Sequence, residues 1–192
     1  MNLSIALSRA VLGAALALGA QAALAQQQQL VPAQSELQFT ARQMGVPLEG
    51  HFKKFSAQVA FDPAKLATSK IAFTVDTGSA TLGSRETDAE LPKPTWFNVP
   101  KFPQAQFEST AIKALGGGRF EVAGKLTIKG TAQAVTVPVT LAQSGATTTA
   151  TGSLPIKRLA FKIGENEWAD TSMVADDVTV KFKLALTGVG KL

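Results

Sequence analysis

The sequence predicts an all-β protein, an eight-stranded antiparallel barrel with a long loop or short helix after its third strand. Apolar and polar residues alternate with a period of two over most of the chain, which is typical of strands with one buried and one solvated face. No long helical pattern occurs after residue 30. A closed barrel and a two-layer sandwich both satisfy these observations, and long strands with a single apolar face favour the barrel.

The N-terminal 25 residues have the features of a secretion signal. Arg9 provides a positive charge, residues 10–20 form an apolar run, and Ala23-Leu24-Ala25 matches a small-residue cleavage site. The run is too short to cross a bilayer as an anchor, since a spanning helix needs about 20 apolar residues. We therefore expect cleavage near Ala25 and a single β-barrel domain over residues 26–192, located in the periplasm.

Composition limits the classes of function. The chain has no Cys, so an exported protein of this size must be stabilised by its core alone. The formal net charge of +5 comes from basic residues that are spread along the sequence rather than clustered. A dispersed positive charge could meet anionic membrane headgroups, although solubility explains it better, and we expect no nucleic-acid partner.

Three strands are expected before residue 77. Apolar residues occupy positions 37, 39 and 41 in the first, 55, 57, 59 and 61 in the second, and 71, 73 and 75 in the third. Met44-Gly45-Val46-Pro47 interrupts the pattern between the first two. Phe52 is out of phase with the second strand, which predicts a bulge or a second apolar surface near His51.

The segment from Thr77 to Pro103 breaks the alternation. It combines glycines, prolines and acids with Trp96 and Phe97. Ser84 followed by acids predicts a short helix over about Arg85 to Leu91. Loops of this length in compact domains are usually lids or binding loops.

The fourth strand is expected over residues 105–112, and a glycine turn at 116–118 leads into a long hairpin over 119–141. In its first half, Phe120, Val122, Gly124, Leu126 and Ile128 share one face, which we expect to be buried. Lys125, Thr127 and Lys129 share the other, which we expect to be solvated. Pro138 cannot donate a ladder hydrogen bond, so it is expected at an edge or a bulge.

The seventh strand, SGATTTATGS at 144–153, contains only small side chains. Its inward residues fill little volume, which predicts leftover room inside an eight-stranded barrel. A mixed segment with Phe161 and Trp168 follows. The last strand, at 178–187, places Val178, Val180 and Phe182 inward.

The residues offer little for catalysis or for metal binding. His51 is the only histidine, and no G-x-S-x-G motif is present. The acids at 86–90 and at 165–170 lack the spacing of a calcium loop. We therefore expect neither enzymatic activity nor a metal, and a hydrolase that pairs His51 with an acidic residue is the weakest of three hypotheses.

Four blocks in this order resemble the YceI-like family, exported proteins with a lipocalin-like barrel: GHFKKFSAQVAFDP, WFNVPKFPQAQFEST, FEVAGKLTIKGTAQAVTVPV and IKRLAFKIGENEWADTSMVADDVTV. The resemblance spans roughly residues 30–186, and its most specific parts are FPQAQFES at 102–109 and LTIKG at 126–130. It implies an apolar tunnel that binds a long amphiphile, such as a polyisoprenoid quinone or a fatty-acid derivative.

The sequence departs from the commoner family pattern after the third strand, where Arg-Asp-x-His-Leu is replaced by the stretch Ser84–Leu91. It is more similar to a branch with a Trp-Ala-Asp block, here Trp168 to Asp170. Some members of that branch are joined to, or found alongside, b-type membrane cytochromes. The resemblance therefore implies a membrane redox protein as a partner.

The first hypothesis is a non-enzymatic periplasmic carrier of such a lipid. The second is a solid barrel that docks a membrane redox protein through the 77–103 loop, and the oligomeric state stays open, a dimer included. The ligand-binding residues expected from the carrier hypothesis are the tunnel-lining Phe39, Phe52, Phe55, Phe73, Phe107, Leu126, Phe161 and Phe182, with Trp96, Phe97 and Trp168 near one end.

Overall fold

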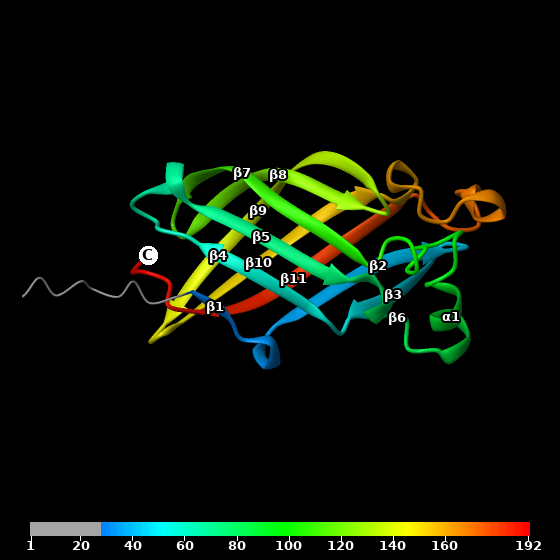
Figure 1. The fold of residues 1–192 in the computed structure, drawn as a ribbon, viewed down its shortest axis with the longest axis horizontal. Helices are drawn as coiled ribbons and strands as arrows, with labels where there is room; N and C mark the ends of the chain where they lie inside the picture. Colours follow the sequence, from blue (N-terminus) through cyan, green and yellow to red (C-terminus); the bar gives the residue numbers. More distant parts are fainter. Residues whose placement is uncertain (1–27) are drawn as a thin grey trace, which may run out of the picture.

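A single antiparallel sheet curls round into an elongated barrel in the computed structural model, which describes residues 28–192 (Figure 1). Neighbouring strands follow the order β4-β5-β7-β8-β9-β10-β11-β2-β3-β6, and β1 pairs with β11. The prediction of an all-β antiparallel barrel is therefore confirmed. The expected signal sequence lies outside the described residues and stays a prediction.

The bounds of the elements are as follows. The strands are β1 (Gln29–Leu30), β2 (Glu36–Gln43), β3 (Val46–Phe52), β4 (Phe55–Ala60), β5 (Lys70–Asp76), β6 (Ala80–Thr81), β7 (Gln104–Gly116), β8 (Arg119–Ile128), β9 (Thr131–Ser144), β10 (Thr147–Lys157) and β11 (Asp177–Thr187). The helices are α1 (Arg85–Glu90) and the 3-10 turns η1 (Pro32–Gln34), η2 (Leu66–Thr68), η3 (Thr77–Ser79), η4 (Arg158–Phe161) and η5 (Asn166–Ala169).

The strand count differs from the prediction mainly at β3, which the sequence pattern did not reveal. β3 pairs with β2 through a tight hairpin in which Met44 and Gly45 both have positive φ, 50° and 79°. This is the geometry of a turn that normally uses Asn-Gly. Phe52 is out of phase with β4 because it belongs to β3, where it points to the interior.

The barrel is closed by contacts other than a full ladder. At one end, the side-chain amide of Gln28 donates to the carbonyl of Phe61 (2.6 Å) and accepts from its N–H (2.8 Å). At the other end, the N–H of Lys53 donates to the carbonyl of Ser79, and the N–H of Asp76 donates to the carbonyl of Lys54. Strand β4 is at one edge of the sheet and forms no ladder with β2, so a seam without strand pairing lies between β2 and β4.

A second break in the ladder lies between β9 and β10. The paired part begins where Val139 of β9 faces Gly152 of β10 and ends where Ser144 faces Thr147. The residues of β9 before Val139 have no partners on β10. Pro138 is the next residue of β9 beyond the last pair, and Pro155 lies three residues beyond that pair on β10. Since proline donates no ladder hydrogen bond, it is tolerated at such a local edge, as predicted for Pro138.

Candidate ligand-binding cavity

The interior of the barrel holds a cavity of about 370 Å³. All the long strands contribute to its wall, and apart from Gln43, Thr77, Thr87, Glu90, Thr148 and Arg158 the lining residues are apolar. Inward-facing side chains such as Phe73 and Val75 are only half-buried, because they border this space rather than a packed core. The volume falls within the range of about 300–1,000 Å³ that is typical of small-molecule sites.

The structure brings nine of the eleven predicted site residues to the cavity wall: Phe39, Phe52, Phe73, Trp96, Phe97, Phe107, Leu126, Trp168 and Phe182. The other two lie elsewhere. Phe55 packs against Phe73 (ring centroids 5.6 Å apart) and lines a second pocket at the seam between β2 and β4. Phe161 is buried in a core cluster with Ile128, Ile156 and Ile163. That any of the nine contacts a ligand stays a prediction.

Glycines on the inner face allow the phenylalanine rings to lie along the wall. A methyl group at Gly50 would collide with the ring of Phe39, and one at Gly152 would collide with the ring of Phe182. Both pairs face each other directly across neighbouring strands. The small residues therefore do not leave voids where they stand. Instead they accommodate rings that would otherwise project into the lumen.

Polar side chains of the wall gather at the end that α1 covers. Thr77, Thr87 and Glu90 come from the segment after β5, and Gln43 ends β2. Among the lining residues only Thr87 and Glu90 are exposed to solvent. We call this place beside α1 the mouth. Thr148, which accepts from Gln143 (3.2 Å), lies near the opposite end.

Helix α1 is held in place by Asp88. Its carboxylate accepts hydrogen bonds from the hydroxyl of Thr81 (2.5 Å) and from the N–H of Leu82 (2.6 Å). These two bonds, the Thr81 bond first, lower the pKa of Asp88 below its ordinary value. The carboxylate is therefore ionised at neutral pH and holds the helix against β6 beside the mouth.

Aromatic rings line the same end of the cavity. The rings of Phe39 and Phe52 are 5.3 Å apart, and those of Phe52 and Phe97 are 6.0 Å apart. Trp96 and Trp168, from the two long segments 77–103 and 158–176, are 5.6 Å apart. The tryptophans therefore join the two segments that cover this end of the barrel, which Figure 1 shows beyond the ends of β7 and β11.

Arg158 organises the 158–176 segment, a role that the sequence pattern did not predict. Its side chain is 2% exposed and donates to five backbone carbonyls, at distances of 2.6–3.0 Å: Ala175, Ile163, Gly164, Trp168 and Val174. Burial lowers the pKa of Arg158, and the charge of Asp176 partly opposes that shift. Because every guanidinium N–H has an acceptor, the segment wraps round one buried cation.

Lys129 corrects the expectation of a solvated outer face. It is buried, and its ammonium group donates to the carbonyl of Lys162 (2.6 Å) and to the carboxylate of Glu165 (2.8 Å). A third, longer contact reaches the carbonyl of Thr95 (3.4 Å). The backbone of Lys129 has a positive φ of 48° at the β8–β9 turn, which takes its side chain out of the alternation of β8.

Replacing Lys129 with methionine is expected to destabilise this end of the barrel. The change leaves the carbonyl of Lys162 without its donor and removes the partner of Glu165, at a cost of about 2 kcal/mol. The melting temperature should fall by about 4–8 °C. Lys125→Met is the matched control, because Lys125 and Glu108 are both more than half exposed and 3.7 Å apart. Equal melting temperatures of the two variants would contradict the assignment.

His51 does not line the cavity. Its side chain is exposed on β3 and lines the seam pocket together with Glu36, Lys53 and Lys54. Within residues 28–192, no hydrogen bond or ion pair joins it to a carboxylate. The same part of the chain contains no group of three or more His, Cys, Asp or Glu side chains that could hold a metal ion. It also has no helix of the length and apolarity needed to span a membrane.

Comparisons with known proteins agree with the architecture. Residues 28–186 match the model of the YceI-like domain. A UPF0312 protein of Yersinia pestis is 38% identical over 106 residues, which cover 55% of this chain and 53% of the relative. A UPF0312 protein of Ectopseudomonas mendocina is 37% identical over 95 residues, which cover 50% and 48%. These alignments span about half the length of the relatives.

Solved structures share the fold. BcnA of Burkholderia cenocepacia is 51% identical, with a TM-score of 0.79 over 81% of this chain and 98% of that one. A polyisoprenoid binding domain from Saccharophagus degradans is 14% identical, with a TM-score of 0.69 over 83% and 97%, which is a likeness of fold alone. Since the domain model covers nearly all of the described residues, the chain belongs to the YceI-like family.

Proposed function

We propose that this protein is a non-enzymatic periplasmic carrier that holds a long amphiphile, a polyisoprenoid quinone or a fatty-acid derivative, inside the barrel. The observation that carries the proposal is the apolar cavity of about 370 Å³. An empty apolar cavity destabilises a protein by roughly 24 cal/mol per Å³ in core-truncation data, and a bound chain would remove that cost. A solved domain of the same fold is described as polyisoprenoid binding, which supports the same class of ligand.

The distribution of polar groups supports one orientation of the ligand. Gln43, Thr87 and Glu90 lie at the mouth, where a quinone or carboxyl headgroup could find hydrogen-bonding partners and water. Beyond the mouth the wall is almost entirely apolar as far as Leu141 and Leu186. We therefore infer that the headgroup stays beside α1 and the hydrocarbon tail extends toward the β9–β10 hairpin.

A tail held in this way is recognised by its length rather than by its chemistry. Each buried methylene contributes about 0.8 kcal/mol, and this contribution has no direction. Affinity should therefore rise with each added unit until the cavity is full. An exported carrier benefits from such binding, because it shields from water a tail that would otherwise aggregate.

A chain-length series tests the proposal. Ubiquinone homologues with increasing numbers of isoprene units, and saturated fatty acids of increasing length, would be titrated into delipidated protein by calorimetry. We expect the affinity to rise with tail length and then to reach a plateau. Affinity that is independent of tail length, or no binding in either series, would contradict the carrier function.

A quinone carrier needs a membrane partner that takes up its ligand. A b-type cytochrome or another membrane redox protein would fit that role, and the exposed part of the 77–103 segment beside the mouth is the surface we propose for it. The alternative of a solid interaction module requires a filled interior, and the open cavity weighs against it. A dimer would have to leave the mouth accessible.

A further inference from the structure

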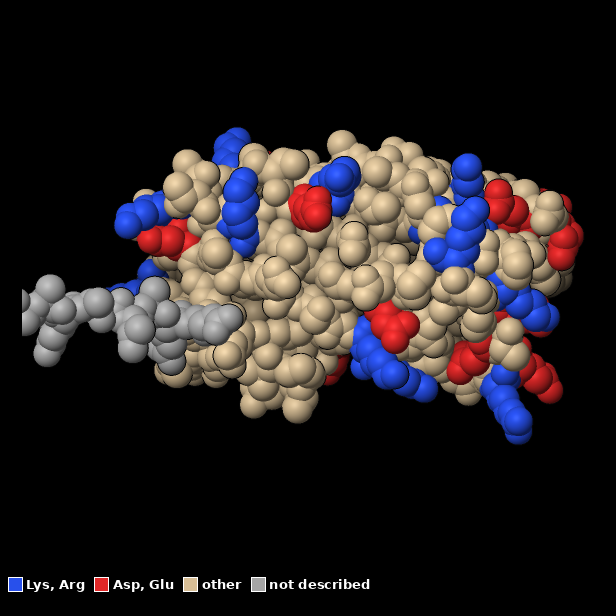
Figure 2. Space-filling model, in the orientation of Figure 1, with Lys and Arg blue, Asp and Glu red and all other residues tan. Residues whose placement is uncertain are grey.

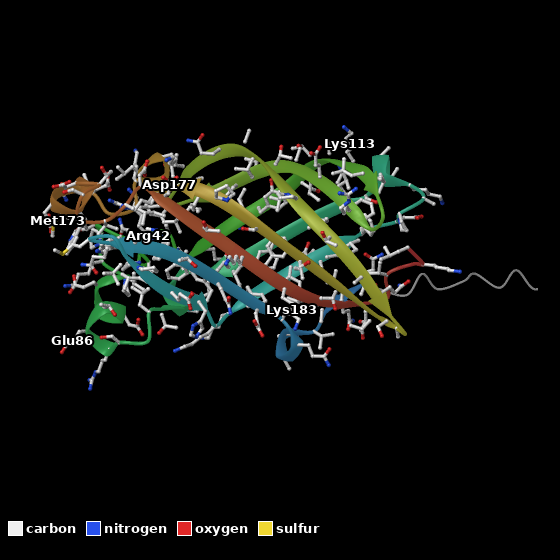
Figure 3. The ribbon with its side chains drawn as sticks, turned by 180° about the vertical axis from the view of Figure 1, so that it is seen from behind. Arg42, Glu86, Lys113, Met173, Asp177 and Lys183 are labelled. Carbon is white, nitrogen blue, oxygen red and sulfur yellow. The ribbon has the colours of Figure 1, made fainter. Side chains whose placement is uncertain are left out.

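The hairpin turn between β2 and β3 and the neighbouring 158–176 segment form an exposed apolar tip. Five large apolar side chains are exposed within residues 28–192, and three of them are here: Met44 (69%), Val46 (61%) and Met173 (40%). The N–H of Met44 donates to the carbonyl of Met173 (2.8 Å), so the two loops hold each other. Figure 3 shows Met173 at the extreme end of the molecule, with Arg42 close by and Lys113 at the opposite end.

The backbone conformation of Met44 indicates that folding does not explain a methionine at this position. Its φ of 50° is in the left-handed region, where Asn or Gly is favoured and a methionine is strained. The side chain recovers little from packing, because it is the most exposed of the five. An unfavourable residue that contacts water in the free protein points to a partner that covers it.

The tip is continuous with the mouth of the cavity. Gln43 and Val174 line the cavity, and each is the immediate neighbour of a tip methionine. The two residues form an isolated β-bridge, so the rim of the cavity and the tip are one unit. An apolar phase in contact with the tip would therefore lie directly beside residues of the cavity wall.

The charge of the surface around the tip indicates how the tip would contact a membrane. Residues 77–103 carry three acids and three bases, residues 158–176 carry four acids and two bases, and Arg42 adjoins the tip, so acids and bases are nearly balanced at this end. Figure 2 shows both signs interspersed at this end of the molecule. Such a surface would not be attracted to anionic headgroups. A convex tip with methionine and valine side chains instead fits shallow insertion into the apolar boundary of a bilayer, which requires no shape complementarity.

We propose that Met44, Val46 and Met173 dock the protein on the surface of a lipid bilayer by apolar insertion, with the mouth facing the membrane. This inference rests on the proposed carrier function, because it identifies the bilayer as the place where the amphiphile is exchanged. Docking itself needs no ligand in the cavity, so the two ideas can fail separately.

Flotation with phosphatidylcholine vesicles that contain no quinone or free fatty acid tests the docking. Wild-type protein should float with the vesicles, and the double variant Met44→Asn/Met173→Ser should lose about fivefold or more of the bound fraction. Asparagine suits the backbone of Met44, so the melting temperature should not fall. Leu115→Ser is the matched control, because Leu115 is 43% exposed at the β7–β8 turn, away from the mouth. It should float like the wild type.

Three outcomes would overturn the docking proposal: no flotation of the wild type, equal flotation of the wild type and the double variant, or an equal loss in Leu115→Ser. Stronger flotation on added phosphatidylglycerol would also contradict insertion that is purely apolar. Calorimetric titration with a detergent-dispersed quinone measures ligand binding in the cavity separately from docking. A double variant that binds quinone normally but fails to float supports docking, whereas wild type that floats but binds no amphiphile contradicts only the carrier function.

Discussion

Replacing Ala57 with tryptophan should abolish tight binding of a long amphiphile while the barrel remains folded. Ala57 lies on the inner face of β4, opposite Phe73, and lines the cavity. An indole ring at this position would occupy part of the lumen. If it displaces three methylenes of the tail, the loss is about 2.4 kcal/mol, or on the order of fiftyfold in Kd. Calorimetric titration with the longest quinone that binds the wild type measures the effect.

The neighbouring residue provides the control. Gln58 is exposed on the outer face of the same strand, so Gln58→Trp introduces the same ring outside the barrel. Its Kd should equal that of the wild type. Because the ring of Ala57→Trp enters a cavity of about 370 Å³ rather than a packed core, its cost in stability should stay within about 1.5 kcal/mol. Equal affinities of the two variants would mean that the ligand binds elsewhere.

Replacing Arg158 with methionine should have the largest effect on stability. Methionine keeps much of the length but donates to none of the five carbonyls, which become buried acceptors without a donor. A cost on the order of 4 kcal/mol follows, since each lost partner of a charged group costs about 1.5–3 kcal/mol and relaxation recovers part of the total. The melting temperature should fall by about 8–16 °C.

Lys157→Met separates this effect from the loss of a basic residue next to Arg158. Lys157 forms an exposed ion pair with Asp177 at 2.7 Å, and both side chains are more than half exposed. Such pairs contribute about 0–1 kcal/mol. If Arg158→Met melted within a few degrees of Lys157→Met, the 158–176 segment would not depend on its buried guanidinium.

The alternating strands could be predicted because burial on one face leaves a local mark at every second residue. The hairpin of β8 and β9 and the inward Phe182 of β11 were found in this way. The same reasoning failed at β3, because Pro47 and Gly50 both oppose a strand assignment. Pro47 is tolerated since β3 has no partner on its outer side there, and Gly50 is needed because the ring of Phe39 lies over it.

The end of the barrel could not be predicted, because its contacts join residues far apart in the sequence. By alternation, Lys129 belongs to the outward-facing residues of β8. Its turn conformation instead directs its side chain to Glu165, 36 residues away in the sequence. Arg158 donates all its side-chain hydrogen bonds to backbone carbonyls, which every residue has, so the amino-acid sequence does not indicate these partners. Phe161 resembled a tunnel residue only because it is aromatic, and the 3-10 turn η4 places it in the core cluster instead.

Native mass spectrometry of the protein, purified without detergent, tests the central claim most directly. Wild type and Gln58→Trp should each carry an added mass that organic extraction identifies as a quinone, another isoprenoid or a fatty-acid derivative. Ala57→Trp should have only the mass of the polypeptide. Wild-type protein that carries no added mass, and acquires none after incubation with quinone or fatty acid, would contradict the account of the barrel as a lipid container.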